Sequence, residues 1–150
     1  ILDTGGGVLN AAKQFNDSPF FVFNPDTIWS YLYLEDLETM EELYFNSSCK
    51  GVLLIVDRNK SFDKTMNGDF NFEGNVINRE GNEKDYIYTG SQILNNSAFY
   101  GKKVEPFSMN SVWDFLIQKK KLLGVKSNQE FLHVANLKIY KQLLKQRFKT

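Results

Sequence analysis

The sequence is poor in cysteine, histidine and proline, and each shortage excludes a class of function. A single cysteine, Cys49, excludes an internal disulfide framework and is typical of a reducing compartment such as the cytoplasm. His133 is the only histidine, so no histidine–cysteine cluster has the spacing of a zinc site. No serine or cysteine sits in a nucleophile motif, and a hydrolase triad therefore has no support.

Charge of one sign and long apolar runs are also lacking. The formal net charge is zero, which gives no indication of nucleic acid or an anionic membrane as a partner. No apolar run is long enough to cross a bilayer, and no signal segment is present. A length of 150 residues with 42% hydrophobic residues predicts one soluble globular domain. Because the chain begins at Ile1 without a methionine, we expect it to be part of a longer protein.

The apolar residues 20–23 and the polar residues after them form the stretch around which the chain is organised. Four apolar residues without polar alternation predict a strand buried on both faces, as in a parallel α/β sheet. Pro25 ends the strand because proline has no N–H to donate. Ligands of open α/β sheets bind beyond the carboxyl ends of strands, so Asn24 and Asp26 are candidate site residues, and a carboxylate there can hold Mg²⁺. An ordinary turn is the alternative, since these residue types are common in turns.

A run of three glycines near the start is the second candidate site. Gly5, Gly6 and Gly7 precede residues 8–15, where Leu9, Ala12 and Phe15 fall near one face of a helix. Glycines before a helix allow close approach of a ligand and can point free N–H groups at it. The run matches neither a Walker loop nor a GxGxxG fingerprint, and a flexible connector is the alternative.

Strand and helix patterns alternate through the middle of the chain. Residues 51–57 predict a second buried strand, after a helix for which Asp36 is a candidate N-cap. This alternation favours crossover units and a parallel sheet. Residues 69–77 predict a β-hairpin beside the sheet. Residues 86–94 predict a further strand, in which Gly90 indicates a bulge, close approach to a ligand, or simple packing.

The last third of the chain predicts two helices around two short strands. Ser108 can cap the first helix, and the strands are expected near 122–125 and 131–134. The final helix has an apolar face and a lysine-rich remainder. It is interpreted as a docked terminal helix, with binding to a membrane or an acidic partner as the alternative. The apolar face consists of Leu137, Tyr140, Leu143, Leu144 and Phe148.

Several motifs together resemble the sugar-1-phosphate nucleotidyltransferases, and their order and spacing cover essentially the whole chain. The similarity is greatest to a short bacterial group of these enzymes. The matching elements are Asp3-Thr4-Gly5-Gly6-Gly7, Phe21-Val22-Phe23-Asn24-Pro25-Asp26, Gly68-Asp69-Phe70, residues 88–94, residues 107–114 and Leu123-Gly124-Val125.

This resemblance implies a Rossmann-like α/β domain over residues 1–150, with a mixed, mainly parallel sheet flanked by helices and a β-hairpin insertion. It implies an enzyme that joins a nucleoside triphosphate to a sugar 1-phosphate and releases pyrophosphate, in nucleotide-sugar biosynthesis for the bacterial cell envelope. Asp26 would bind Mg²⁺, and Gly5, Gly6 and Gly7 would contact the nucleotide base. The residues facing the sugar phosphate would be Asn24, Asp69, Thr89 and Gly90.

The chain departs from the family pattern in two places. His133 stands where relatives usually carry a second Mg²⁺-binding aspartate, so with Asp26 it is the second candidate metal ligand, although imidazole is a poorer Mg²⁺ ligand than carboxylate. The family's glycine-rich signature loop has no counterpart here, so we expect an N-terminal segment of the same protein as a partner and no activity without it. A non-catalytic nucleotide-binding or sugar-phosphate-binding regulatory relative is the alternative. No nucleic acid or membrane partner is expected, and a homodimer is left open.

Overall fold

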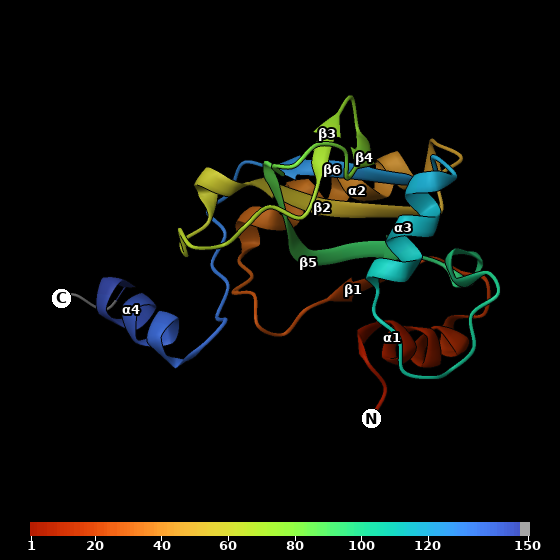
Figure 1. Ribbon diagram of the computed structural model, residues 1–150, viewed down its shortest axis with the longest axis horizontal. Helices are drawn as coiled ribbons and strands as arrows, with labels where there is room; N and C mark the ends of the chain where they lie inside the picture. The colour runs from red at the N-terminus through yellow and green to blue at the C-terminus, as the bar shows by residue number, and fades with distance from the viewer. Residues whose placement is uncertain (148–150) are drawn as a thin grey trace.

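In the computed structural model, which describes residues 1–147, one sheet carries helices on both of its faces (Figure 1). Its strands are β1 (Phe20–Phe23), β2 (Gly51–Asp57), β3 (Asn71–Glu73), β4 (Val76–Asn78), β5 (Tyr86–Leu94) and β6 (Leu122–Ser127). The α-helices are α1 (Thr4–Ala12), α2 (Leu34–Phe45), α3 (Asn110–Gln118) and α4 (Leu137–Arg147).

The direction of the strands differs from the expectation. The order across the sheet is β1-β5-β2-β6-β4-β3, and within the described residues β2 and β6 are the only parallel neighbours. The predicted α/β sheet with flanking helices is thus confirmed, but its mainly parallel character is confirmed only in part. The reason is that β5 lies antiparallel between β1 and β2, so these two strands point the same way without pairing.

Strand β2 is the centre of the molecule and is buried on both faces, as its continuous apolar pattern predicts. Leu53 and Ile55 join the apolar cluster that holds α1 and α3. Val52 and Leu54 join the cluster that holds α2 on the opposite face. Since all four side chains are 0% exposed, each face of β2 contributes to a separate core layer.

Strand β1 forms where the sequence predicts it, but it is not buried on both faces. It pairs with β5 on one side, and within the part of the chain that the structure describes no strand pairs with its other side. Phe21 is 37% exposed and Phe23 is 44% exposed, while Phe20 is buried. The prediction of a fully buried strand was wrong because an unbroken apolar run does not show whether both edges and both faces are covered.

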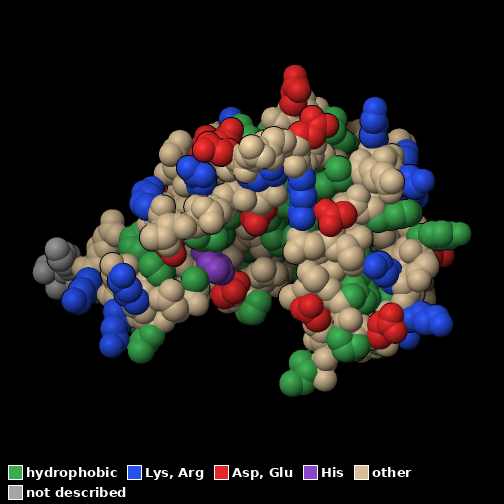
Figure 2. All heavy atoms as spheres, viewed as in Figure 1, with side chains coloured by type: hydrophobic (Ala, Val, Ile, Leu, Met, Phe, Trp, Pro, Cys, Tyr) green, Lys and Arg blue, Asp and Glu red, His purple; other side chains and the backbone are tan. Residues whose placement is uncertain are grey.

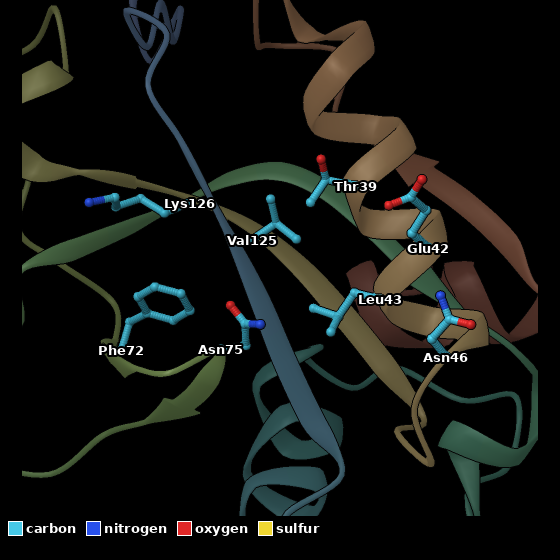
Figure 3. Close-up of a pocket in the computed structure, with 8 residues that line it drawn as sticks. All are labelled: Thr39, Glu42, Leu43, Asn46, Phe72, Asn75, Val125 and Lys126. Atoms are coloured by element: carbon cyan, nitrogen blue, oxygen red, sulfur yellow. The ribbon is translucent and has the colours of Figure 1, made fainter.

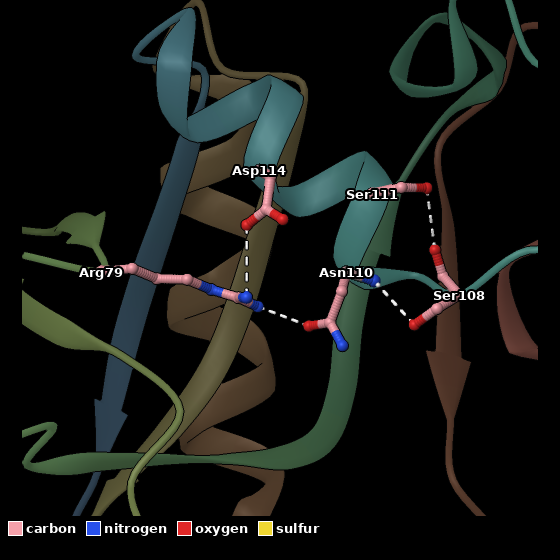
Figure 4. Close-up of polar contacts among 5 residues, drawn as sticks. All are labelled: Arg79, Ser108, Asn110, Ser111 and Asp114. Atoms are coloured by element: carbon pink, nitrogen blue, oxygen red, sulfur yellow. Dashed lines mark hydrogen bonds and ion pairs between the residues drawn. The ribbon is translucent and has the colours of Figure 1, made fainter.

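The β3–β4 hairpin confirms the prediction for residues 69–77. Gly74 and Asn75 both have positive φ, 52° and 70°, which matches the twist of a tight hairpin turn. Strand β4 joins the sheet by pairing with β6. Arg79, just after β4, ties the hairpin to α3 through an ion pair with Asp114 at 3.2 Å and a hydrogen bond to Asn110 (Figure 4).

Several helix boundaries differ from the predicted ones. Helix α2 begins at Leu34, so Asp36 lies in its first turn and does not cap it. Helix α3 begins at Asn110, and the Asn110 N–H donates to the Ser108 hydroxyl. The strand expected near 131–134 is reduced to isolated bridges made by Phe131 and His133.

Helix α4 forms as predicted but packs with a different face. Ile139 and Leu143 are buried against Leu132. The predicted apolar face is otherwise outside, as Leu137, Tyr140 and Leu144 are exposed and Phe148 lies outside the described residues. No helix of residues 1–147 is long and apolar enough to cross a membrane.

Candidate functional site

Asp26 and His133, the two predicted metal ligands, lie in contact beyond the carboxyl end of β1. The Nε2 of His133 is 3.1 Å from the Oδ2 of Asp26. The backbone holds them there: Thr27 and His133 form an isolated antiparallel bridge, and the Val134 N–H donates to the Asp26 carbonyl at 2.7 Å. The carboxylate remains 48% exposed, so one side of it is open to a ligand.

The His133 ring is fixed on its other side by packing. It stacks on the ring of Phe131 with centroids 5.8 Å apart and planes 11° from parallel. Its Nδ1 is buried and has no hydrogen-bond partner within the described chain. Nε2 therefore faces the Asp26 carboxylate, and Nδ1 is enclosed on the opposite side of the ring.

The side chains at this position could bind Mg²⁺ only together with groups of the substrate. Residues 1–147 contain no group of three or more histidine, cysteine or acidic side chains that could enclose a metal ion. Mg²⁺ characteristically takes one or two carboxylates and completes its shell with waters and substrate phosphates. Asp26 supplies such a carboxylate, whereas the nitrogen of His133 is a poor ligand for so hard a cation.

Asn24 and Gly90 are brought together at the bulge in β5. The Asn24 N–H donates to the Gly90 carbonyl at 2.8 Å. Gly90 has a φ of +96°, and a Cβ there would lie 2.7 Å from the Asn24 Cβ. The pairing of β2 with β5 shifts register at this point, so the predicted bulge is confirmed. What approaches this glycine closely is the Asn24 side chain.

Thr89 is placed next to Gly90, but its side chain points into the core. It is 0% exposed, and its hydroxyl donates to the Leu54 carbonyl at 2.9 Å. Its own carbonyl accepts from the Thr27 hydroxyl at 2.7 Å. Thr89 therefore links β2, β5 and the segment after β1, and its hydroxyl is not free for a phosphate.

Asp69 lies on the hairpin side of β5. Its Oδ2 accepts from the Tyr88 N–H at 2.9 Å. Desolvation by burial raises the pKa of this carboxyl, against the lowering effects of the Tyr88 N–H and the Arg79 guanidinium. Asp69 thus contacts the same strand as Gly90, but it is no part of the cavity described next.

A cavity of about 210 Å³ opens beside Asn24, between the sheet and helices α1 and α3. Its lining comes from four elements that are far apart in the sequence. The Trp113 Nε1–H donates to the Gln92 Oε1 at 2.9 Å, and the Trp113 and Tyr88 rings meet edge to face at 4.8 Å. The lining residues are Thr4, Val8, Asn24, Tyr88, Gln92, Met109 and Trp113.

Tyr88 and Gln92 are polar residues of this cavity that the sequence analysis did not single out. The Tyr88 hydroxyl is enclosed and has no hydrogen-bond partner among the described residues, and burial raises its pKa. The two residues stand four apart in β5, and both line the same cavity. That spacing is a signal which could have placed them together, whereas the contribution of α1 and α3 depends on tertiary packing.

The three glycines lie inside the first turns of α1 and not in a loop before it. The N–H groups of Gly5 and Gly6 donate to the Phe107 carbonyl at 2.9 and 3.3 Å, and that of Gly7 to the Asp3 carbonyl at 2.8 Å. The expected free N–H groups are therefore absent from these residues. Gly5 and Gly6 serve close packing, since a Cβ would lie 2.3 Å from the Phe107 ring and 2.1 Å from the Glu105 carbonyl. A nucleotide contact at Gly7, where an added Cβ would meet nothing within 4 Å outside its own helix, stays a prediction.

A larger groove of about 530 Å³ lies elsewhere, between α2 and the hairpin (Figure 3). Leu43, Phe72 and Val125 give it an apolar floor. None of the predicted site residues lines it. Size therefore does not identify the candidate site, which rests on the chemistry around Asp26 and Asn24.

Solved structures share this fold. HddC from Yersinia pseudotuberculosis, in complex with GMP-PN, has a TM-score of 0.66 and 21% identity over 97% of this chain and 62% of that chain. A putative glucose-1-phosphate thymidylyltransferase from Bacillus anthracis, in complex with sucrose, has a TM-score of 0.71 and 12% identity over 99% of this chain and 62% of that chain. An inositol-1-phosphate CTP transferase from T. maritima has a TM-score of 0.68 and 14% identity over 99% and 64%.

These likenesses establish the fold, and they confirm the structural resemblance that the motifs predict. The chain spans less than two thirds of the length of each of these proteins, 62% to 64%. No family model and no curated protein matches the sequence.

Proposed function

The chain has the fold of the sugar-1-phosphate nucleotidyltransferases, and on this basis we propose that it forms the larger part of such an enzyme. The reaction joins a nucleoside triphosphate to a sugar 1-phosphate. An oxygen of the sugar phosphate attacks the phosphorus that carries the nucleoside, and the bond to pyrophosphate breaks. Such transfers depend on positioning and on neutralising phosphate charge, and they need no covalent nucleophile from the protein.

The observation that carries this proposal is a half-exposed carboxylate, Asp26, at the carboxyl end of β1 and two residues from a cavity wall. Asp26 would hold Mg²⁺, which supplies neutralisation of the phosphate oxygens when bound. Asn24 lines the cavity and would face the sugar phosphate, held in place by its close contact with Gly90. Asp69 would lie across the Tyr88 backbone from this cavity.

This proposal gives Thr89 and the glycines of α1 smaller roles than the sequence predicts. Thr89 would act as a positioning residue, since its hydroxyl already donates to Leu54. Of the glycines, Gly7 keeps open space beside it for a nucleotide base. The N–H groups of Gly5 and Gly6 are used in the fold.

We propose that a further segment of the same protein supplies the groups that grip the triphosphate. The unpaired edge of β1 and the exposed rings of Phe21 and Phe23 suit the addition of a strand. The 62% coverage of HddC leaves room for such a segment. A single buried cysteine is consistent with a reducing compartment such as the cytoplasm.

The second candidate function is a sugar-phosphate-binding relative without transferase activity. The contact of His133 with the Asp26 carboxylate favours it, because one carboxylate oxygen is already engaged. Calorimetric titration with sugar 1-phosphates and with nucleoside triphosphates, followed by a pyrophosphate-release assay with both, separates the two. We expect pyrophosphate only when a matched pair and Mg²⁺ are present, in protein that includes the upstream segment. Binding without release would support the second candidate.

A further inference from the structure

The charges of this neutral chain are strongly segregated between two helices. Helix α2 carries acidic residues and neither lysine nor arginine. Helix α4 carries basic residues and no acidic one. The acidic set is Glu35, Asp36, Glu38, Glu41 and Glu42, and the basic set is Lys138, Lys141, Lys145 and Arg147.

Helix α4 also exposes an apolar stripe beside its lysines. Leu137, Tyr140 and Leu144 are 64%, 47% and 38% exposed. Their spacing of three and four residues places them on one face, apart from the buried Ile139 and Leu143. Figure 2 shows Lys and Arg side chains gathered over α4 at the end of the molecule. The stripe and its lysines form a surface that the other described residues leave uncovered.

The outer face of α2 has the complementary chemistry. Leu34 and Phe45, at the two ends of the helix, are 58% and 63% exposed. Glu38 and Glu41 stand between them on the same face, at helical spacing. A groove of about 380 Å³ runs along this face and is lined by Glu38, Glu41, Glu42, Phe45 and Asn46.

The central charges of both faces form no ion pairs within the part of one copy that the structure describes. Among the described residues, no ion pair involves Glu38, Glu41, Lys141 or Lys145. Exposed opposite charges at these densities attract one another at a distance and fix the register of a contact. The exposed apolar residues of both helices add hydrophobic stabilisation to a contact, and this stabilisation remains when salt screens the charges.

We propose that the stripe of α4 in one copy docks on the outer face of α2 in a second copy of this chain. A two-fold axis makes the contact twice, with each copy giving its α4 and receiving that of its partner. The helices, 11 and 12 residues long, match in length. The acidic face of α2 supplies the charge complementary to α4 within the same protein, which makes a second copy the partner of this surface.

Sedimentation equilibrium at 50 mM salt, on protein that includes the upstream segment, tests the proposal. We expect a dimer whose dissociation constant rises by about tenfold or more at 1 M salt, where the Debye length is only about 3 Å. A monomer at every protein and salt concentration would overturn the proposal, and this result needs no variant.

A charge-swap pair identifies the surfaces. The variant Glu38→Lys/Glu41→Lys/Glu42→Lys and the variant Lys138→Glu/Lys141→Glu/Lys145→Glu should each be monomeric, with circular dichroism confirming the fold. Mixed together they should form a one-to-one heterodimer, because both contacts are then complementary. The control Lys13→Glu/Lys60→Glu/Lys103→Glu changes as much charge on other exposed surfaces and should leave the dimer intact. Swapped variants that still dimerise alone, or that fail to combine, would contradict the α2–α4 contact.

Discussion

The Nε2 of His133 lies 3.1 Å from the Oδ2 of Asp26, although the two residues come from opposite ends of the chain. The contact is set by the antiparallel bridge between Thr27 and His133, so the backbone and not the side chains decides that these groups meet. The contact places a histidine nitrogen where a second carboxylate would complete a Mg²⁺ site.

His133→Asp is expected to tighten Mg²⁺ binding on the order of tenfold, because a hard anionic oxygen replaces an imidazole nitrogen beside Asp26. The rise in melting temperature with added MgCl₂ measures this, since a ligand of the folded state stabilises it by mass action. His133→Asn is the matched control, with similar size and no charge. Equal Mg²⁺ responses in the two variants would rule out a metal position at this pair.

Tyr88→Phe is expected to leave the free energy of unfolding unchanged or to raise it by up to about 1 kcal/mol, because it removes an enclosed hydroxyl that has no partner. Tyr33→Phe makes the same change where the hydroxyl donates to the Glu130 carbonyl at 3.0 Å. It should cost about 1 kcal/mol. Urea unfolding of both variants gives the comparison. A clear loss of stability in Tyr88→Phe would mean that its hydroxyl has a bound partner in solution.

Gly90→Ala is expected to destabilise the fold by about 2 kcal/mol or more, since the new Cβ meets Asn24 at a positive φ. Gly7→Ala is the control inside a helix, where nothing lies within 4 Å of the added Cβ. It should stabilise by about 0.5–1 kcal/mol. Thermal unfolding reports both. An unaffected Gly90→Ala would show that Asn24 and the bulge are not held as described.

Asp36 provides a pH test on α2. Burial raises the pKa of its carboxyl, with a smaller rise from Glu35 and an opposing effect from the Ser127 hydrogen bond. A raised pKa means that the folded state holds the proton more tightly than the unfolded state, so this group favours folding at low pH. That contribution is lost as the pH rises through the folded pKa, above the ordinary value of about 4.

Asp36→Asn should therefore melt at a higher temperature than the wild type at pH 7, and the difference should shrink as the pH falls towards about 4. The new amide oxygen can still accept from the Ser127 hydroxyl. Glu38→Gln, exposed on the same helix, is the matched control and should change little. A melting temperature lowered at pH 7 by Asp36→Asn would contradict the sign of this effect.

The sequence predicts local structure well where one side chain or one period decides it. The continuous apolar run of β2 and the Gly74–Asn75 turn of the hairpin are examples, since burial on both faces and two positive φ angles leave few alternatives. The bulge at Gly90 was one of three alternatives that the sequence left open, and the register shift between β2 and β5 confirms it.

The sequence could not show which segment packs against each apolar surface. Strand β1 reads as buried because its residues are apolar, yet its exposure depends on which strand pairs with its free edge. The apolar residues of α4 are ambiguous in the same way, as Ile139 and Leu143 dock while Leu137 and Tyr140 do not. The glycines of α1 were predicted to face a ligand, and only the fold shows that Gly5 and Gly6 face Phe107 and Glu105.

The proposed activity is tested most directly by pyrophosphate release from Asp26→Asn and wild type, in protein that includes the upstream segment. Asn keeps the size of the side chain and removes the charge that would hold Mg²⁺, so we predict a fall in turnover of about 100-fold or more. Stability should change little, because the Asp26 carboxylate is 48% exposed and contacts only His133 among the described ionisable groups. Near-normal pyrophosphate release by Asp26→Asn would contradict the account.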